Sequence, residues 1–342
     1  MVLEKLKVKF LVILNKIIWN KIQIKHMKKL KNYIKDYIDE SVWDIEDNVE
    51  SNNKEFILAN VKRFIDNNYL DNMSRHCEYI FDEKQEKYIV NCKRDIIFKS
   101  KVECLTDGTF KWGTVEGWFD CSNCPITSLE GAPEEVGMTF DCHKCTKLKS
   151  FKGAPETVGD NFNCSNCNKL KTLEGAPKKV GGDFDCRWCT NLKSLKGAPE
   201  YVGENFDCHE CPKLESLQGG PEKVGGAFSC CTCPKLESLE GAPKSVGRGF
   251  YCFECPIITL QGAPEYVGGG FYCSSCPITS LQGAPRRVDG TFDCSYCEDL
   301  SSLEGAPKEV GENFYCQGCP NLYSLDGVGK VKGIIVNDIK NK

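Results

Sequence analysis

Hydrophobic residues recur along the last two thirds of the chain with a fixed period of 21 or 22 residues. One unit is "VGENFDCHECPKLESLQGGPEK", residues 202–223, whose apolar positions hold Val, Phe, two Cys and two Leu. The first cysteine of each unit marks the register, at positions 121, 142, 164, 186, 208, 230, 252, 273, 294 and 316. A period of this length predicts a solenoid, in which each unit buries its apolar side against its neighbours.

The spacing inside one unit predicts its local structure. Phe206 and Cys208 lie two residues apart, which places both side chains on one face of a strand. The Gly-Ala-Pro element has no helical spacing, so we expect the convex side to be extended or turn-like. The sequence therefore predicts a β-rich solenoid, a leucine-rich-repeat-like right-handed coil with one parallel sheet of about twelve strands.

The first third of the chain has a different pattern. Apolar residues at three-and-four spacing predict amphipathic helices over residues 28–40 and 53–68, with a flexible acidic joint over 41–52 between them. Residues 77–92 and 94–105 predict short strands. We expect a helical region over 1–70, with Met27 as an alternative start, capping strands over 71–118, ten repeats over 119–328, and a C-terminal cap over 329–342 that closes the core.

Composition and charge narrow the class of protein. A net charge of −4 over 342 residues supplies no overall basic surface, which argues against nucleic acid as a partner. The apolar run at residues 10–14 is too short for a transmembrane segment or a signal peptide. Twenty-four cysteines without an export signal indicate a reducing compartment, so we expect a protein that is not secreted.

The repeated Cys-x-x-Cys pairs allow three interpretations: structural thiol columns, zinc or iron–sulfur binding, and redox exchange. A structural zinc ion takes four Cys or His ligands, but all ten pairs are equivalent. Cysteine packs well as a small hydrophobic residue, and stacked strands would align like positions in columns. We therefore expect structural columns without metal or cofactor, in which serine at Cys208 would lack a hydrogen-bond partner. Cys231 should point outward as a reactive thiol.

The unit resembles the leucine-rich-repeat pattern L-x-x-L-x-L-x-x-N/C-x-L over residues 100–336, with Cys211 at the Asn/Cys position. The segment "MKKLKNYIKDYIDESVWDIEDN", followed by Gly-Ala-Pro repeats, is similar to uncharacterised proteins of tailed bacteriophages. This resemblance implies a virus-encoded protein that acts in the cytoplasm of the infected host cell or in the virion.

The positions that differ between repeats are those that point outward. The residue between Phe and the first Cys changes from mostly Asp in the early repeats to mostly Tyr in the later ones. Varied aromatic and arginine side chains on a rigid surface are typical of interfaces, although a merely solvated surface is the alternative. The predicted partner-binding residues of this concave face are Asp141, His143, Asp185, Arg187, Trp188, Asp207, His209, Tyr251, Phe253, Tyr272, Tyr296 and Tyr315.

These patterns favour a non-enzymatic scaffold, expected to be a monomer, that binds a protein partner. Asp141 with His143, and Asp207 with His209, are spaced like catalytic pairs, but no nucleophile recurs beside them. Two alternatives remain open: a zinc-binding Cys-rich repeat protein, and a module of a virion that binds a glycan or host surface.

Overall fold

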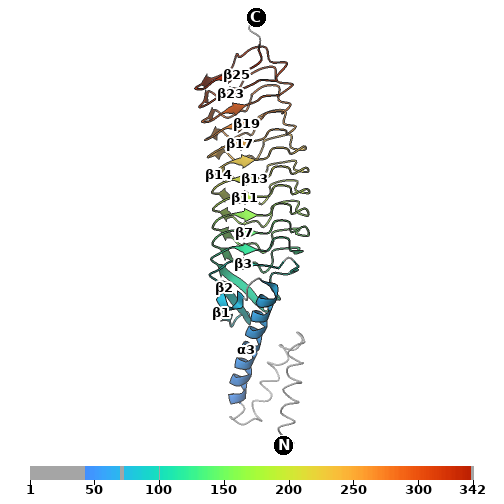
Figure 1. Cartoon of the computed structure of the whole chain (residues 1–342), viewed down its shortest axis with the longest axis vertical. Helices are drawn as coiled ribbons and strands as arrows, with labels where there is room; N and C mark the ends of the chain where they lie inside the picture. The colour runs from blue at the N-terminus through green and yellow to red at the C-terminus, as the bar shows by residue number, and fades with distance from the viewer. Residues whose placement is uncertain (1–42, 70–72, 100, 340–342) are drawn as a thin grey trace, which may run out of the picture. The chain divides into compact units, whose positions relative to one another are not determined.

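The computed structural model describes residues 43–69, 73–99 and 101–339. The chain divides into two compact units, Met1–Ile57 and Leu58–Lys342, and the second contains the repeats. Its coils stack on one another in register, as Figure 1 shows. The predicted β-solenoid preceded by a helical region is confirmed. Between residues 101 and 339 the structure has no helix, so the Gly-Ala-Pro side is turn-like as expected.

Two sheets run along the stack, where the sequence predicted one. The first, here called the valine sheet, has 13 strands. They are β1 (Cys77–Asp82), β2 (Lys87–Cys92), β4 (Phe110–Val115), β6 (Glu135–Val136), β8 (Thr157–Val158), β10 (Lys179–Val180), β12 (Tyr201–Val202), β14 (Lys223–Val224), β16 (Ser245–Val246), β18 (Tyr266–Val267), β20 (Arg287–Val288), β22 (Glu309–Val310) and β24 (Lys330–Val331).

The second sheet, here called the phenylalanine sheet, has 12 strands. They are β3 (Ile96–Ile97), β5 (Phe119–Asp120), β7 (Phe140–Asp141), β9 (Phe162–Asn163), β11 (Phe184–Asp185), β13 (Phe206–Asp207), β15 (Phe228–Ser229), β17 (Phe250–Tyr251), β19 (Phe271–Tyr272), β21 (Phe292–Asp293), β23 (Phe314–Tyr315) and β25 (Ile335–Val336). All pairs within the repeats are parallel; only β1 pairs antiparallel, with β2.

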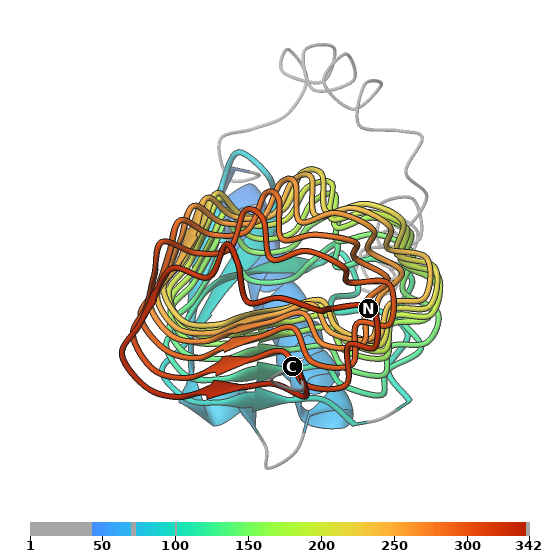
Figure 2. The same ribbon diagram turned by 90° about the horizontal axis from the view of Figure 1, so that it is seen from above.

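The core lies between the two sheets and the Gly-Ala-Pro side, inside the ring that each coil forms in Figure 2. Phenylalanine rings from Phe119 to Phe314 stack along it, with centroids 5.1 to 5.4 Å apart. Val, the paired Cys and two further apolar residues of each coil, mostly Leu, complete the buried columns. Phe206 and Cys208 are both fully buried, as their spacing predicted.

In all repeat coils but one, a glycine follows the valine and lies close to the preceding coil at the bend between the sheets; Asp289, after Val288, is the exception. A Cβ atom on Gly203 would lie 1.9 Å from the carbonyl oxygen of Gly181 in the preceding coil. The same conflict recurs at Gly181 and Gly225, each 2.0 Å from the preceding glycine oxygen. Real atoms do not approach this closely, so the stacking distance depends on glycine at this bend.

The segment before the repeats corrects two predictions. Helix α3 spans Trp43–Asn68, so residues 43–52 are helical and are not the flexible joint that their acidic character suggested. The helix predicted over 28–40 lies outside the described residues. The end of α3 packs on the first coils through aromatic contacts, with Phe64 5.6 Å from Phe110 and Tyr69 5.6 Å from Trp112, between ring centroids. No helix in the described part of the chain is long and apolar enough to span a membrane.

At the other end, β24 and β25 extend each sheet by one parallel strand. They continue the stack and cover the core of the last repeat, where Phe314 is fully buried. Ile335 takes the place of phenylalanine in the stack and is 38% exposed, and Ile334 beside it is 61% exposed.

Candidate functional site

The turn that follows each strand of the phenylalanine sheet is held by the second cysteine of the pair. In the sixth repeat, Cys233 donates its backbone N–H to Sγ of Cys255, at 3.4 Å, and this thiol donates to the carbonyl oxygen of Cys230, at 3.2 Å. Equivalent thiols donate to the first cysteine of the preceding coil from Cys145 to Cys319. The second column therefore supplies hydrogen bonds to buried backbone carbonyls of the first column.

Burial governs the chemistry of these thiols. It raises the pKa of Cys211 to about 12 and places the pKa of Cys208 well above its usual value. Both thiols therefore keep their protons at neutral pH, and Cys208 donates to the carbonyl oxygen of Ser229 at 3.2 Å. The expectation that serine at position 208 would lack a partner is wrong, because this carbonyl would accept its hydroxyl. Among the described residues, no three His, Cys, Asp or Glu side chains converge to hold a metal ion.

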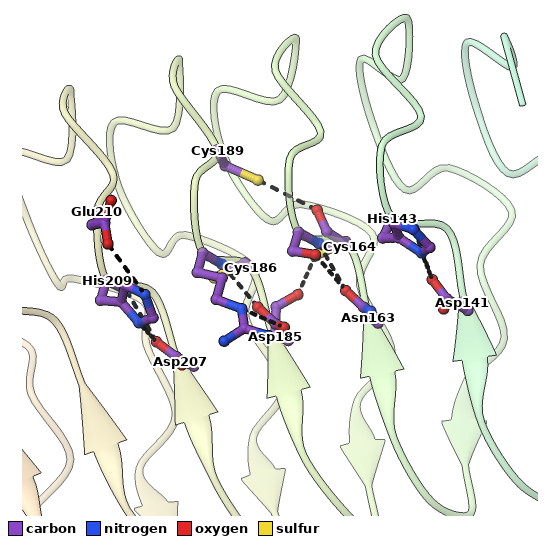
Figure 3. A network of polar contacts seen from close by, with 12 residues as sticks. Asp141, His143, Asn163, Cys164, Asp185, Cys186, Cys189, Asp207, His209 and Glu210 are labelled. Atoms are coloured by element: carbon purple, nitrogen blue, oxygen red, sulfur yellow. Dashed lines mark hydrogen bonds and ion pairs between the residues drawn. The ribbon is translucent and has the colours of Figure 1, made fainter. Parts of the chain in front are cut away.

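Some aspartates of the acidic outward column accept hydrogen bonds from the backbone. In Figure 3, Asp141 and Asp207 each turn back toward a histidine two residues later. Oδ1 of Asp207 accepts the backbone N–H of His209 at 3.2 Å and lies 2.6 Å from its Nδ1. Asp141 holds His143 in the same way, at 2.8 Å for both contacts. Side chains that bond the backbone two residues on stabilise turns, so these aspartates have a structural role as well as an exposed position.

The predicted residues occupy three columns. Asp141, Asp185, Asp207, Tyr251, Tyr272 and Tyr315 lie on the strands themselves. His143, Arg187, His209 and Phe253 follow at the first position of the turn, and Trp188 and Tyr296 lie one residue later. This last position has a left-handed backbone, with φ of 58° at both Trp188 and Tyr296. The turn presents Tyr296 outward, at 58% exposure.

Four predicted residues meet at one place on this face. A hollow of about 300 Å³ is lined by Asp183, Phe184, Asp185, Arg187, Asn205, Phe206, Asp207, Ala227, Ser229 and Tyr251. Nε of Arg187 lies 3.0 Å from Oδ2 of Asp185, off the hydrogen-bond direction, so Nε has no hydrogen-bond partner among the described residues. The guanidinium also lies over the ring of Trp188, 4.7 Å from its centroid.

The electrostatics at the hollow are shaped by burial. Burial raises the pKa of Asp185 to about 6, and it outweighs the backbone N–H and charge of Arg187, which lower it. The hydrogen bond that the His209 ring donates to Asp207 raises the pKa of His209. Nε2 of His209 lies 3.7 Å from a carboxylate oxygen of Glu210, so both ring nitrogens face acids rather than a nucleophile.

The other predicted residues are more dispersed. Tyr251 and Tyr272 stack with centroids 4.9 Å apart and ring planes within 1°. Asp141 and His143 lie two coils before the hollow, and Tyr315 lies three coils after Tyr251.

Cys231 corrects a sequence prediction. It occupies the outward column but is only 8% exposed, lying 3.5 Å from the hydroxyl of Ser229. Burial also raises the pKa of this thiol, which disfavours the reactive thiolate. The exposed cysteine in the described part of the chain is Cys104.

Sequence reasoning missed Asp183, Asn205 and Ala227, which line the hollow two residues before the predicted column. The period-2 rule for strands gives the signal that would have found them, because residues i and i−2 share a face. Comparison of the chain with protein-family models, curated proteins and solved structures found no match.

Proposed function

We propose that this protein is a non-enzymatic scaffold that binds a protein partner on the outer face of the phenylalanine sheet. The observation that carries the proposal is the hollow, which interrupts a face whose framework repeats almost unchanged from coil to coil. Side chains on regular strands are already ordered, so a partner that contacts them loses little conformational entropy. Tyr251, Trp188 and Tyr296 are the aromatic anchors, with Asp185, Asp207 and Arg187 fixing orientation.

Other functions receive less support. Tyr251 and Tyr272 cover one face of each other, and the aspartates beside the open face of Tyr251 favour a cationic ligand over a neutral sugar ring. A structural zinc ion takes four converging ligands, and no three His, Cys, Asp or Glu side chains of the described residues converge in this way. Elemental analysis of purified protein tests the zinc alternative, which stoichiometric zinc and unfolding by a chelator would establish.

The origin and relationships of the chain are also part of the proposal. The second thiol of a coil hydrogen-bonds backbone groups in the turn, which is the role expected of a side chain at the Asn/Cys position of a leucine-rich repeat. This shared role supports placing the repeat in that class. With the resemblance of the N-terminal segment to phage proteins, we place the protein in an infected cell or a virion.

The test compares partners recovered from lysate of the source cell by the wild type and by a Tyr251→Ala/Tyr272→Ala variant. We expect the variant to lose partners that the wild type retains. A matched Tyr201→Ala/Tyr266→Ala variant removes two exposed tyrosines from the valine sheet and should retain them. Identical recovery by all three proteins would contradict the proposed face, and loss only on deleting residues 1–70 would assign binding to the N-terminal region.

A further inference from the structure

The hollow on the phenylalanine sheet carries an excess of negative charge. Carboxylates of Asp183, Asp185 and Asp207 line it, against the single guanidinium of Arg187. Asn205 donates two hydrogen bonds to Oδ1 of Asp183, and His209 contacts Oδ1 of Asp207. From the described residues, neither Oδ2 atom receives a hydrogen bond. Both oxygens therefore retain their capacity to accept from a ligand.

An aromatic ring closes one side of the same hollow. Tyr272 covers one face of the Tyr251 ring, at a centroid distance of 4.9 Å. The opposite face is turned toward the preceding coil, where Ser229 and Ala227 have short side chains. The next two coils carry tyrosine at the position of Ser229, with their rings over Gly249 and Gly270, so the hollow lies where this short ring stack ends, beside Ser229 and Ala227. Its volume of about 300 Å³ is enough for the end of one long side chain.

We infer that this hollow binds an arginine side chain of the protein partner, an inference that rests on the proposed function. A guanidinium is planar, so it stacks on the free face of Tyr251 as the next layer of the ring stack. Its N–H donors face the free oxygen of Asp207, and charge-assisted hydrogen bonds of this kind are the stronger ones. The carboxylate of Asp183, one coil further from Tyr251, adds to the negative charge around the guanidinium. Lysine supplies the charge without the plane, and phenylalanine supplies the plane without the charge.

The repeats themselves provide variants that preserve the fold. Ser229→Tyr places in the hollow the residue that positions 251, 272 and 315 already carry. Asp207→Asn removes one charge, and Asn163 shows that asparagine fits this column. Asp293→Asn makes the same change away from the hollow and serves as the matched control. Melting temperatures establish that each variant is folded before binding is compared.

Binding is measured by NMR on the full chain labelled with ¹³C in its tyrosine rings, with Tyr251 assigned from its loss in Tyr251→Phe. The probe is the peptide acetyl-Gly-Arg-Gly-amide, and the matched peptides carry citrulline, lysine or phenylalanine in place of arginine. We expect the arginine peptide to shift the Tyr251 signals in a saturable way, and citrulline, which has the same shape without the charge, to leave them unmoved. Ser229→Tyr should abolish binding, Asp207→Asn should weaken it about tenfold, and Asp293→Asn should not change it.

Three results overturn the inference: equal binding of the citrulline peptide, stronger binding of the phenylalanine or lysine peptide, or undiminished binding by Ser229→Tyr. Its failure is distinguishable from failure of the proposed function. If the arginine peptide does not bind while the Tyr251→Ala/Tyr272→Ala variant still loses its partner, the face binds a partner but the hollow does not bind arginine. If the peptide binds but no partner depends on the face, the proposed function falls instead.

Discussion

At the scale of single residues, the cysteines act as hydrogen-bonding groups rather than as reactive ones. Cys255 both accepts from Cys233 N–H and donates to the Cys230 carbonyl oxygen while only 2% exposed. Valine matches its size but makes neither bond, so Cys255→Val should lower the free energy of unfolding by about 1–3 kcal/mol. Cys255→Ser keeps both bonding functions and should cost less. Urea denaturation of both variants measures the difference, and an equal loss would show that the thiol contributes packing alone.

Burial in the folded protein disfavours the charged form of Asp185. Its pKa is raised by burial to about 6, so the folded protein holds a proton there that the unfolded chain releases near pH 4. The free energy of unfolding should therefore fall as pH rises from about 4 through 6. The neighbouring charges are Arg187, Asp207 and His209, with Asp183 on the same strand face.

Asp185→Asn removes this titration while keeping a side chain that fits the column. We expect the variant to be more stable than the wild type by about 2 kcal/mol at pH 7.5 and to match it below pH 4. Urea denaturation at the two pH values gives the comparison. A difference of the same size at both values would mean that shape or hydrogen bonding, not charge, sets the effect.

At the scale of the element, the bend between the sheets has no side chain in most coils, although Asp289 occupies this position in one. Gly203→Ala places a methyl group 1.9 Å from the Gly181 carbonyl oxygen, so adjacent coils must separate. We expect a loss of about 1–3 kcal/mol, the usual cost of overpacking. Glu204→Ala, one residue later and exposed, is the control and should be near neutral. Thermal unfolding measures both, and comparable melting temperatures for the two variants would contradict close stacking at this bend.

The same scale shows what sequence patterns can and cannot predict. Phe206 and Cys208 were placed in the core because their identity repeats with the period, which fixes register. In the valine sheet, Val202 is buried, whereas Glu200 and Glu204, two residues to either side, are exposed. This sheet was missed because no pair of apolar residues at a spacing of two marks its strand, as Phe206 and Cys208 do in the other sheet. The hollow was missed because it depends on a difference between coils, Ser229 beside Tyr251, that matters only once strands are stacked. The acidic residues 43–52 suggested a joint because solvated helices and loops share that composition.

At the scale of the whole molecule, each coil contacts mainly the coils before and after it. Stability in such a stack is approximately a sum of coil and interface contributions, so coils should be interchangeable units. Val224 and Val246 are direct partners in the valine sheet, and a glycine follows each. Removing residues 225–246 would therefore join equivalent points and bring Phe206 against Phe250.

We expect this deletion variant to keep the far-ultraviolet circular dichroism of the wild type per residue and to unfold with a smaller denaturant m-value, because less surface is exposed on unfolding. Removing only residues 225–235 should instead destroy the fold, because half a coil carries the next apolar residues to the wrong side of the stack. Loss of structure in both variants would contradict an additive stack. If the variant lacking residues 225–246 keeps its structure and the variant lacking residues 225–235 does not, then the period of the repeat, rather than any single coil, specifies the architecture.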